Sequence, residues 1–132
     1  MKYLLDTHTW IWWNTRSERL SKKVSSLIAA SKNYEELLLS AISCWEFSKL
    51  VEKGRFRISV SGEKWIAEAL DMANLCLVPL TPEIAWQSTV LPGSFHDDPG
   101  DQIIVATARQ ENAAIITTDK LILNYEHVQS VW

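Results

Sequence analysis

Near the beginning of the chain stands the stretch Tyr3-Leu4-Leu5-Asp6-Thr7-His8. A short apolar run that stops abruptly at a carboxylate predicts a parallel strand buried on both faces. The arrangement recurs at residues 114–117, where a second apolar run is followed by Asp119. Ligands bind beyond the carboxyl ends of strands in open parallel sheets, so Asp6 and Asp119 are candidate functional residues.

Apolar runs and amphipathic stretches alternate along the rest of the chain. The predicted strands are residues 3–5, 37–39, 75–80, 114–117 and 128–131. The predicted helices are residues 9–14, 43–53, 61–73 and 98–112, with two more after the N-cap candidates Ser21 and Thr81. This alternation is typical of βαβ units, so we predict the α/β class with an open parallel sheet covered by helices on both faces.

The composition fits one globular domain. The 132 residues are 47% hydrophobic, which is too apolar for a disordered chain. Cys44 and Cys76 are the only cysteines, too few for a disulfide scaffold. The longest uncharged stretch, residues 84–95, is shorter than the ~18 residues of a membrane helix. Asp6 interrupts the apolar start and argues against a signal peptide, so we expect a soluble cytoplasmic protein without membrane contact.

The net charge of −3 hides an uneven distribution. Between Arg16 and Arg57, nine basic and five acidic residues give +4, whereas four basic and eleven acidic residues elsewhere give −7. Solvated helix faces would explain this asymmetry without any function. Alternatively, the basic part contacts a polyanion and the acidic part holds a site that needs carboxylates.

Further carboxylates stand near predicted helix starts, namely Glu46, Asp98 and Asp101. Two acids on adjacent strand ends would repel each other unless a cation lay between them. Carboxylate oxygens suit Mg²⁺ or Mn²⁺. The sequence has no zinc-type spacing, because its histidines are scattered and no CxxC occurs.

Most of these acids also have a structural explanation. Ser43 and Glu46 match a capping box, in which the glutamate reaches back to the backbone N–H of the N-cap serine. Asp98 before a proline is a good N-cap, and Asp101 would sit in the favourable first turn of the same helix. Asp119 could begin a turn or cap the next segment. Asp6 alone has no obvious structural explanation.

Four segments together resemble a known family. They are Leu4-Leu5-Asp6-Thr7-His8, Ser40-Ala41-Ile42-Ser43-Cys44-Trp45-Glu46, His96-Asp97-Asp98-Pro99-Gly100-Asp101 with the following Ile103-Ile104-Val105-Ala106-Thr107-Ala108, and Ile116-Thr117-Thr118-Asp119. Their order and spacing resemble those of PIN-domain proteins, and specifically of VapC-type toxin ribonucleases of toxin–antitoxin systems. The resemblance covers essentially the whole chain, residues 1–132, as a single PIN domain.

The resemblance implies a three-layer α/β/α sandwich with a central parallel sheet of strand order 3-2-1-4-5. It carries catalytic and metal-binding roles onto Asp6, Glu46, Asp101 and Asp119 around one or two Mg²⁺ or Mn²⁺ ions. Glu46 would bind metal through water or help to deprotonate the nucleophile. Supporting roles fall on Thr7, Asp98 and Thr117. Where the family often has arginine after the third acid, this chain has Gln102, which puts one supporting contact in doubt.

The function implied is metal-dependent endoribonuclease hydrolysis of RNA phosphodiester bonds, as the toxin of a type II toxin–antitoxin pair. A cognate antitoxin and a homodimer are the further partners that it implies. Basic residues after Glu46 are the candidates for the RNA backbone, namely Lys49, Lys53, Arg55 and Arg57. The seven tryptophans could stack on bases or cover a dimer interface, but core packing is the favoured interpretation, as for Trp10 and Trp13. For His8 and His96 we favour plain surface positions over phosphate contact.

Three other function classes share part of this sequence pattern. A haloacid-dehalogenase-like phosphatase also begins with a strand that ends in aspartate, but it needs a second aspartate where His8 stands. A receiver-type signalling domain would need paired acids near the first strand. A PIN binding module without catalysis is disfavoured because all four acids are present.

Overall fold

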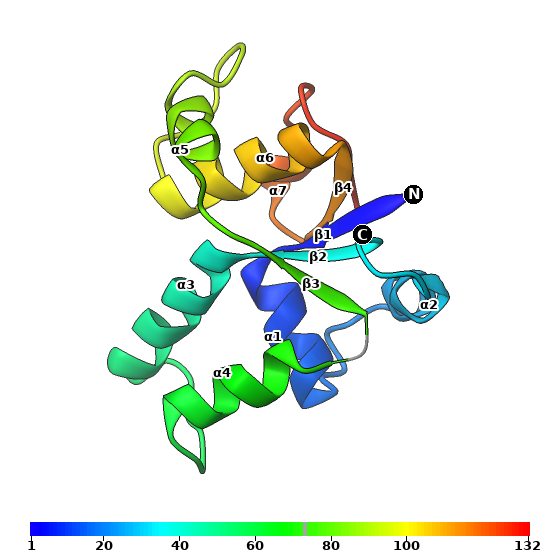
Figure 1. Ribbon diagram of the computed structural model, residues 1–132, viewed down its shortest axis with the longest axis vertical. Coiled ribbons are helices and arrows are strands. Elements are labelled where there is room, and N and C mark those ends of the chain that lie inside the picture. Colours follow the sequence, from blue (N-terminus) through cyan, green and yellow to red (C-terminus); the bar gives the residue numbers. More distant parts are fainter. Residues whose placement is uncertain (73) are drawn as a thin grey trace.

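The computed structural model describes residues 1–72 and 74–132. Strands and helices alternate along the chain (Figure 1). The strands are β1 (Lys2–Leu5), β2 (Leu37–Ser40), β3 (Leu75–Val78), β4 (Ala113–Ile116) and β5 (Ser130–Val131). The helices are α1 (Thr7–Thr15), α2 (Lys22–Ala30), α3 (Ala41–Glu52), α4 (Gly62–Leu70), α5 (Pro82–Thr89), α6 (Pro99–Glu111) and α7 (Lys120–Leu123).

All strand pairs are parallel, and the sheet has the order β3-β2-β1-β4-β5. The predicted fold class and strand order are therefore confirmed. In the register of the sheet, Leu5 at the end of β1 lies opposite Ile116 at the end of β4. The residues that follow these two strands consequently emerge side by side at the carboxyl edge of the sheet.

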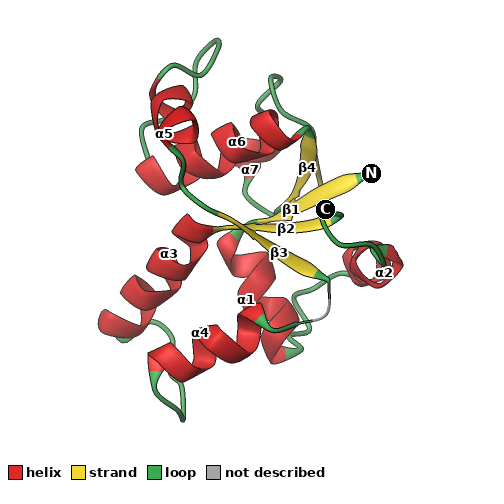
Figure 2. Ribbon diagram, viewed as in Figure 1, coloured by secondary structure: helices red, strands yellow, loops and turns green. Residues whose placement is uncertain are grey.

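The sheet is covered on both faces, as the continuous apolar strands require (Figure 2). Alternate residues point to opposite faces, so Leu4 joins a core with α5, α6 and α7. Leu5 joins a second core with side chains from α1, α2, α3 and α4. Together these two cores make the three-layer α/β/α sandwich.

An aromatic cluster fills the second core. Trp10 is fully buried, and its ring meets the rings of Trp65 at 5.3 Å and Phe47 at 6.0 Å, both edge-on. Phe47 in turn stacks on Trp65 with ring centroids 4.0 Å apart. The cluster locks α1, α3 and α4 together, because aromatic pairs of this geometry add to the burial of apolar area. Core packing is thus confirmed for Trp10, and Trp13 packs against the same core.

Several predicted boundaries are wrong by a few residues. Helix α1 begins at Thr7 rather than 9, and β5 covers only Ser130–Val131 of the predicted 128–131. The strand predicted to 80 ends at Val78, and the helix predicted to 73 ends at Leu70, although Ala73 itself lies outside the described residues. The short helix α7 was not predicted. Within residues 1–72 and 74–132, no helix is long and apolar enough to cross a membrane.

Candidate active site

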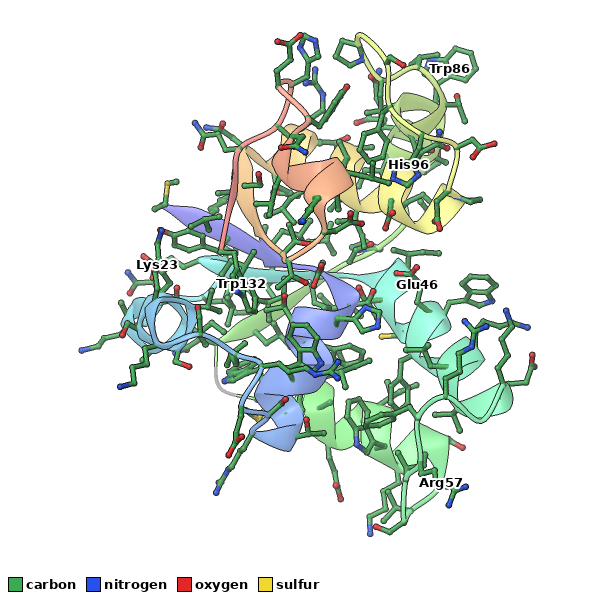
Figure 3. The ribbon with its side chains drawn as sticks, turned by 180° about the vertical axis from the view of Figure 1, so that it is seen from behind. Lys23, Glu46, Arg57, Trp86, His96 and Trp132 are labelled. Atoms are coloured by element: carbon green, nitrogen blue, oxygen red, sulfur yellow. The ribbon has the colours of Figure 1, made fainter. Side chains whose placement is uncertain are left out.

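A pocket of about 460 Å³ opens at the carboxyl edge of the sheet, and all four predicted catalytic acids line it. Its lining includes Asp6, Glu46, Asp101 and Asp119, together with the predicted supporting residues Thr7 and Asp98. Glu46 comes from α3 and His96 from the loop before α6, and both lie on the same side of the molecule in Figure 3. The acids are separated by up to 113 residues in the chain, so only the parallel sheet brings them together.

Asp6 is the N-cap of α1, which is the structural role that the sequence did not reveal. One carboxylate oxygen accepts the backbone N–H of Thr9 at 2.8 Å, and the other accepts the hydroxyl of Thr117. Asp6 is only 8% exposed. Because each carboxylate oxygen has a second lone pair, these bonds orient Asp6 and still leave acceptor sites toward the pocket.

Asp98 and Asp119 cap α6 and α7 in the same way. Asp98 accepts the backbone N–H of Asp101 at 3.2 Å, which confirms the predicted N-cap and places Asp101 in the first turn of α6. Asp119 accepts the N–H of Leu121 at 2.9 Å. The partial positive charge at a helix N-terminus stabilises a nearby carboxylate, so the fold offsets part of the repulsion in the pocket.

Glu46 lies in the middle of α3 and caps nothing, so the capping-box explanation is wrong. The helix begins earlier, at Ala41, because the hydroxyl of Ser40 accepts the N–H of Ile42 at 3.2 Å. Glu46 instead accepts the Thr7 hydroxyl at 2.5 Å. The Thr7 hydroxyl is also 2.9 Å from that of the fully buried Ser43. A hydroxyl has one proton, so Thr7 donates to Glu46 while accepting from Ser43.

Gly100 is a further residue whose contribution sequence reasoning missed. A Cβ atom at this position would overlap a carboxylate oxygen of Glu46. The first turn of α6 therefore approaches α3 closely only because residue 100 has no side chain. A glycine between two candidate acids was the available signal, since glycine often marks a close approach of backbone.

Comparison with known proteins identifies the family. The model of the PIN domain matches residues 3–127. The chain belongs to the PIN domain family. Ribonuclease VapC22 of Mycobacterium tuberculosis is 31% identical to it over 128 residues, 97% of this chain and 95% of that protein. The match confirms the PIN interpretation over the phosphatase and receiver alternatives.

Solved structures show the same fold. A chain of VapBC2 from Rickettsia felis, bound to a promoter DNA fragment, has a TM-score of 0.71 at 16% identity and covers 99% of this chain and 98% of its own. A chain of a toxin–antitoxin complex from Klebsiella pneumoniae has a TM-score of 0.69 at 22% identity, with coverage of 99% and 97%. This PIN domain therefore shares its architecture with chains of such complexes over nearly its full length.

Two acids of the pocket, Asp101 and Glu46, have a raised pKa. Burial, followed by the charges of Asp98 and Asp119 and then of the other acids, raises the pKa of Asp101 to about 7. Burial also raises the pKa of Glu46, with smaller contributions from Asp98 and Asp6, although its hydrogen bond from Thr7 acts in the opposite direction. Keeping these carboxylates ionised is unfavourable, and a bound cation would lower that free-energy cost.

The donor atoms of this PIN domain fit a divalent metal ion. Two sets of side chains bring ligand atoms within 4.8 Å of one another, namely His96, Asp101 and Asp119, and Glu46, Asp98 and Asp101. Asp101 belongs to both sets, whereas Asp6, which we expected among the ligands, belongs to neither. His96 is half-buried rather than on the open surface, with Nε2 3.1 Å from a carboxylate oxygen of Asp101. The predominance of carboxylate oxygens suits Mg²⁺ or Mn²⁺.

The predicted cations divide into two groups. Lys49, Lys53 and Arg55 line the same pocket as the acids. Arg57 does not line it and lies at the far end of the molecule from His96 in Figure 3.

The predicted supporting residue Thr117 is buried below the acids. Its hydroxyl donates to Asp6 and accepts the N–H of Asp119 at 2.9 Å, so it connects the ends of β1 and β4.

Proposed function

We propose that this PIN domain is a metal-dependent endoribonuclease that hydrolyses RNA phosphodiester bonds and acts as the toxin of a type II toxin–antitoxin pair. The observation that carries the proposal is the convergence of four acids and three cations on one pocket. The 31% identity to Ribonuclease VapC22 supports the same activity. We treat residues 1–132 as one PIN domain, because all strands join a single sheet.

Asp6, Asp101 and Asp119 would hold one or two Mg²⁺ or Mn²⁺ ions, with Glu46 contributing directly or through water. When bound, such an ion supplies positive charge that attracts the RNA phosphate and makes water a better nucleophile. Without it, the carboxylates would repel the anionic substrate. The raised pKa of Asp101 supports this interpretation, because burial and then the neighbouring carboxylates disfavour its negative charge, and a bound cation would offset both effects.

The protein's own groups would orient the reaction. Glu46, fixed by the Thr7 hydroxyl at 2.5 Å, is placed to accept the proton of the attacking water. Its raised pKa brings it closer to neutral pH, where a general base works best. Asp6 is held in place by its hydrogen bonds from Thr9 and Thr117, which orient its carboxylate at the edge of the site. Lys49, Lys53 and Arg55 would bind backbone phosphates at the mouth of the pocket.

The proposed partners are an antitoxin and a second copy of the chain in the cytoplasm. Several large apolar side chains between β3 and the end of α5 are exposed to solvent, namely Leu77, Leu80, Trp86 and Val90. Exposed large apolar and aromatic side chains are common in protein interfaces. The protein products of adjacent reading frames, co-expressed with this chain, would reveal the antitoxin by inhibition of RNA cleavage. Sedimentation of the wild type and of Trp86→Ala would test the homodimer.

Cleavage of RNA by the purified protein in Mg²⁺ or Mn²⁺ tests the central proposal. EDTA should abolish the activity, and Glu46→Gln should lower kcat by more than about 100-fold because it removes the base without changing the shape of the side chain. Because Glu46 lies inside α3 and caps no helix, this substitution should not destabilise a helix end. Cleavage that persists in EDTA would exclude the metal mechanism, and complete inactivity of the wild type would favour the non-catalytic binding module.

A further inference from the structure

Two tryptophans are exposed in the described part of the chain. Trp45 is 58% exposed on α3, and Trp86 is 65% exposed on α5. Trp45 lines the acid pocket, whereas Trp86 lies on a different surface, beside α6. A large indole ring left in water next to candidate catalytic groups contributes nothing to the core, so its position calls for a ligand.

The surroundings of Trp45 indicate the chemistry of that ligand. The ammonium group of Lys49 lies 5.9 Å from the centre of the indole ring, one helical turn away. Lys53 and Arg55 line the same pocket, and within residues 1–72 and 74–132 neither takes part in a salt bridge. The pocket therefore offers a π-face and positive charges beside its carboxylates.

This combination matches a nucleotide. A base has a flat π-surface that stacks on indole, and the phosphate beside it carries the charge that lysine and arginine bind. The neighbouring residue of Trp45 in the chain is Glu46, which places the stacking surface directly beside the candidate reaction centre. A peptide could also stack on Trp45, but the free cations would have no matching group unless that peptide were acidic.

We propose that Trp45 stacks on an unpaired base of the RNA substrate next to the phosphate that is cut. The inference rests on the proposed ribonuclease function and makes it more specific. A base can reach an exposed indole only when it has left its own helical stack, so the base that Trp45 contacts must be unpaired. Trp45 is thus a positioning residue that selects unpaired RNA and takes no part in the proton transfers.

The expected effect is a loss of substrate binding. Stacking on an aromatic residue has a measurable contribution for each base, so Trp45→Ala should lower kcat/KM by about 5- to 100-fold, mainly through KM. Trp45→Phe keeps a π-face and should retain most of the activity. Because the side chain is exposed, neither variant should change the melting temperature appreciably.

The matched control is Tyr34→Ala. Tyr34 is also an exposed aromatic residue, at 67%, but it precedes the amino end of β2 and therefore lies at the edge of the sheet opposite the pocket. Its removal should leave kcat and KM unchanged. A loss of activity in both alanine variants would overturn the assignment of a specific role to Trp45.

The deciding experiment combines these variants with altered substrates. A single-stranded RNA that the wild type cuts is selected from a random-sequence pool, and single bases are then removed in turn while the backbone is kept. The wild type should lose activity when one particular base near the cut is missing, and Trp45→Ala should be indifferent to that position. The same RNA annealed to its complement should be a poor substrate for the wild type.

Three results separate the possible failures. Normal cleavage by Trp45→Ala, or equal sensitivity of both proteins to every missing base, would overturn the stacking proposal and leave the ribonuclease function intact. Normal cleavage combined with weaker inhibition by a co-expressed antitoxin would assign Trp45 to the protein partner instead. If the wild type cut no RNA in Mg²⁺ or Mn²⁺, the proposed function itself would fail.

Discussion

The aromatic core beneath the sheet and the acid pocket at its edge follow opposite physical rules. Around Trp10, apolar rings pack against one another, and Trp10 and Phe47 are fully buried, so their contacts favour the folded state. In the pocket, like charges are held together, and the pKa of Asp101 rises to about 7. Helix α3 belongs to both regions, because Phe47 enters the core while the preceding Glu46 faces the pocket. The core therefore stabilises an arrangement that the pocket by itself would oppose.

The largest expected effect comes from damage to the core. Trp10→Ala should lower the free energy of unfolding by about 3–5 kcal/mol, because it leaves a cavity where a fully buried indole contacts two other rings. Urea denaturation followed by far-UV circular dichroism would measure it. Trp45→Ala is the control, since that side chain is 58% exposed and its loss should change stability by less than about 0.5 kcal/mol. A small effect of Trp10→Ala would mean that the core tolerates voids.

In the pocket, by contrast, we expect a substitution to remove activity without lowering stability. Asp101→Asn should lower RNA cleavage by more than about 100-fold, since it removes a charge common to both candidate ligand sets. The metal-free variant should nevertheless be as stable as the wild type or more so, because repulsion among the carboxylates is relieved. Activity and melting temperature, measured on the same samples, would test both halves. Unfolding of the variant would instead indicate that Asp101 serves mainly to stabilise the first turn of α6.

The same repulsion should make stability depend on pH. The pKa of Asp101 is about 7 in the folded protein against 3.8 for an unperturbed aspartate, so between these values only the folded state keeps the proton. The free energy of unfolding should therefore fall as pH rises from 3.8 to about 7 and level off above it. We expect a contribution of no more than about 2 kcal/mol at this partly exposed carboxyl. The difference between wild type and Asp101→Asn, followed by denaturation without metal at several pH values, isolates this contribution. An unchanged difference across that range would contradict it.

The smallest expected effect concerns the cations at the rim. Lys53→Ala and Arg55→Ala should each weaken RNA binding a few-fold and reduce the salt slope of the logarithm of affinity by about 0.7, the value for one lost phosphate contact on a single strand. Arg57→Ala should change neither quantity, because Arg57 does not line the pocket. Binding to the inactive Glu46→Gln protein at several salt concentrations would measure these slopes. Equal losses in all three variants would indicate a wider basic surface than the pocket alone.

Local signals predicted most of the helices and strands. The caps at Ser21, Thr81 and Asp98 were identified correctly, because an N-cap is a contact between residues three apart. The same local rule failed at Ser43. Ser43 stands three residues before Glu46 and Ser40 stands six before it, and Ser40 is the cap because β2 runs directly into α3. Ser43 was then free to turn its hydroxyl inward toward Thr7.

The sequence by itself determined the alternation of strands and helices, and it singled out the acids that stand at strand ends and helix starts. The family resemblance added the strand order, which the structure confirms. Only the tertiary structure decided that Asp6 accepts the hydroxyl of Thr117, that Thr7 bridges Ser43 and Glu46, and that Gly100 makes room for Glu46. These are contacts between segments tens of residues apart. Their geometry depends on how the sheet twists and how the helices pack on it, which no local pattern encodes.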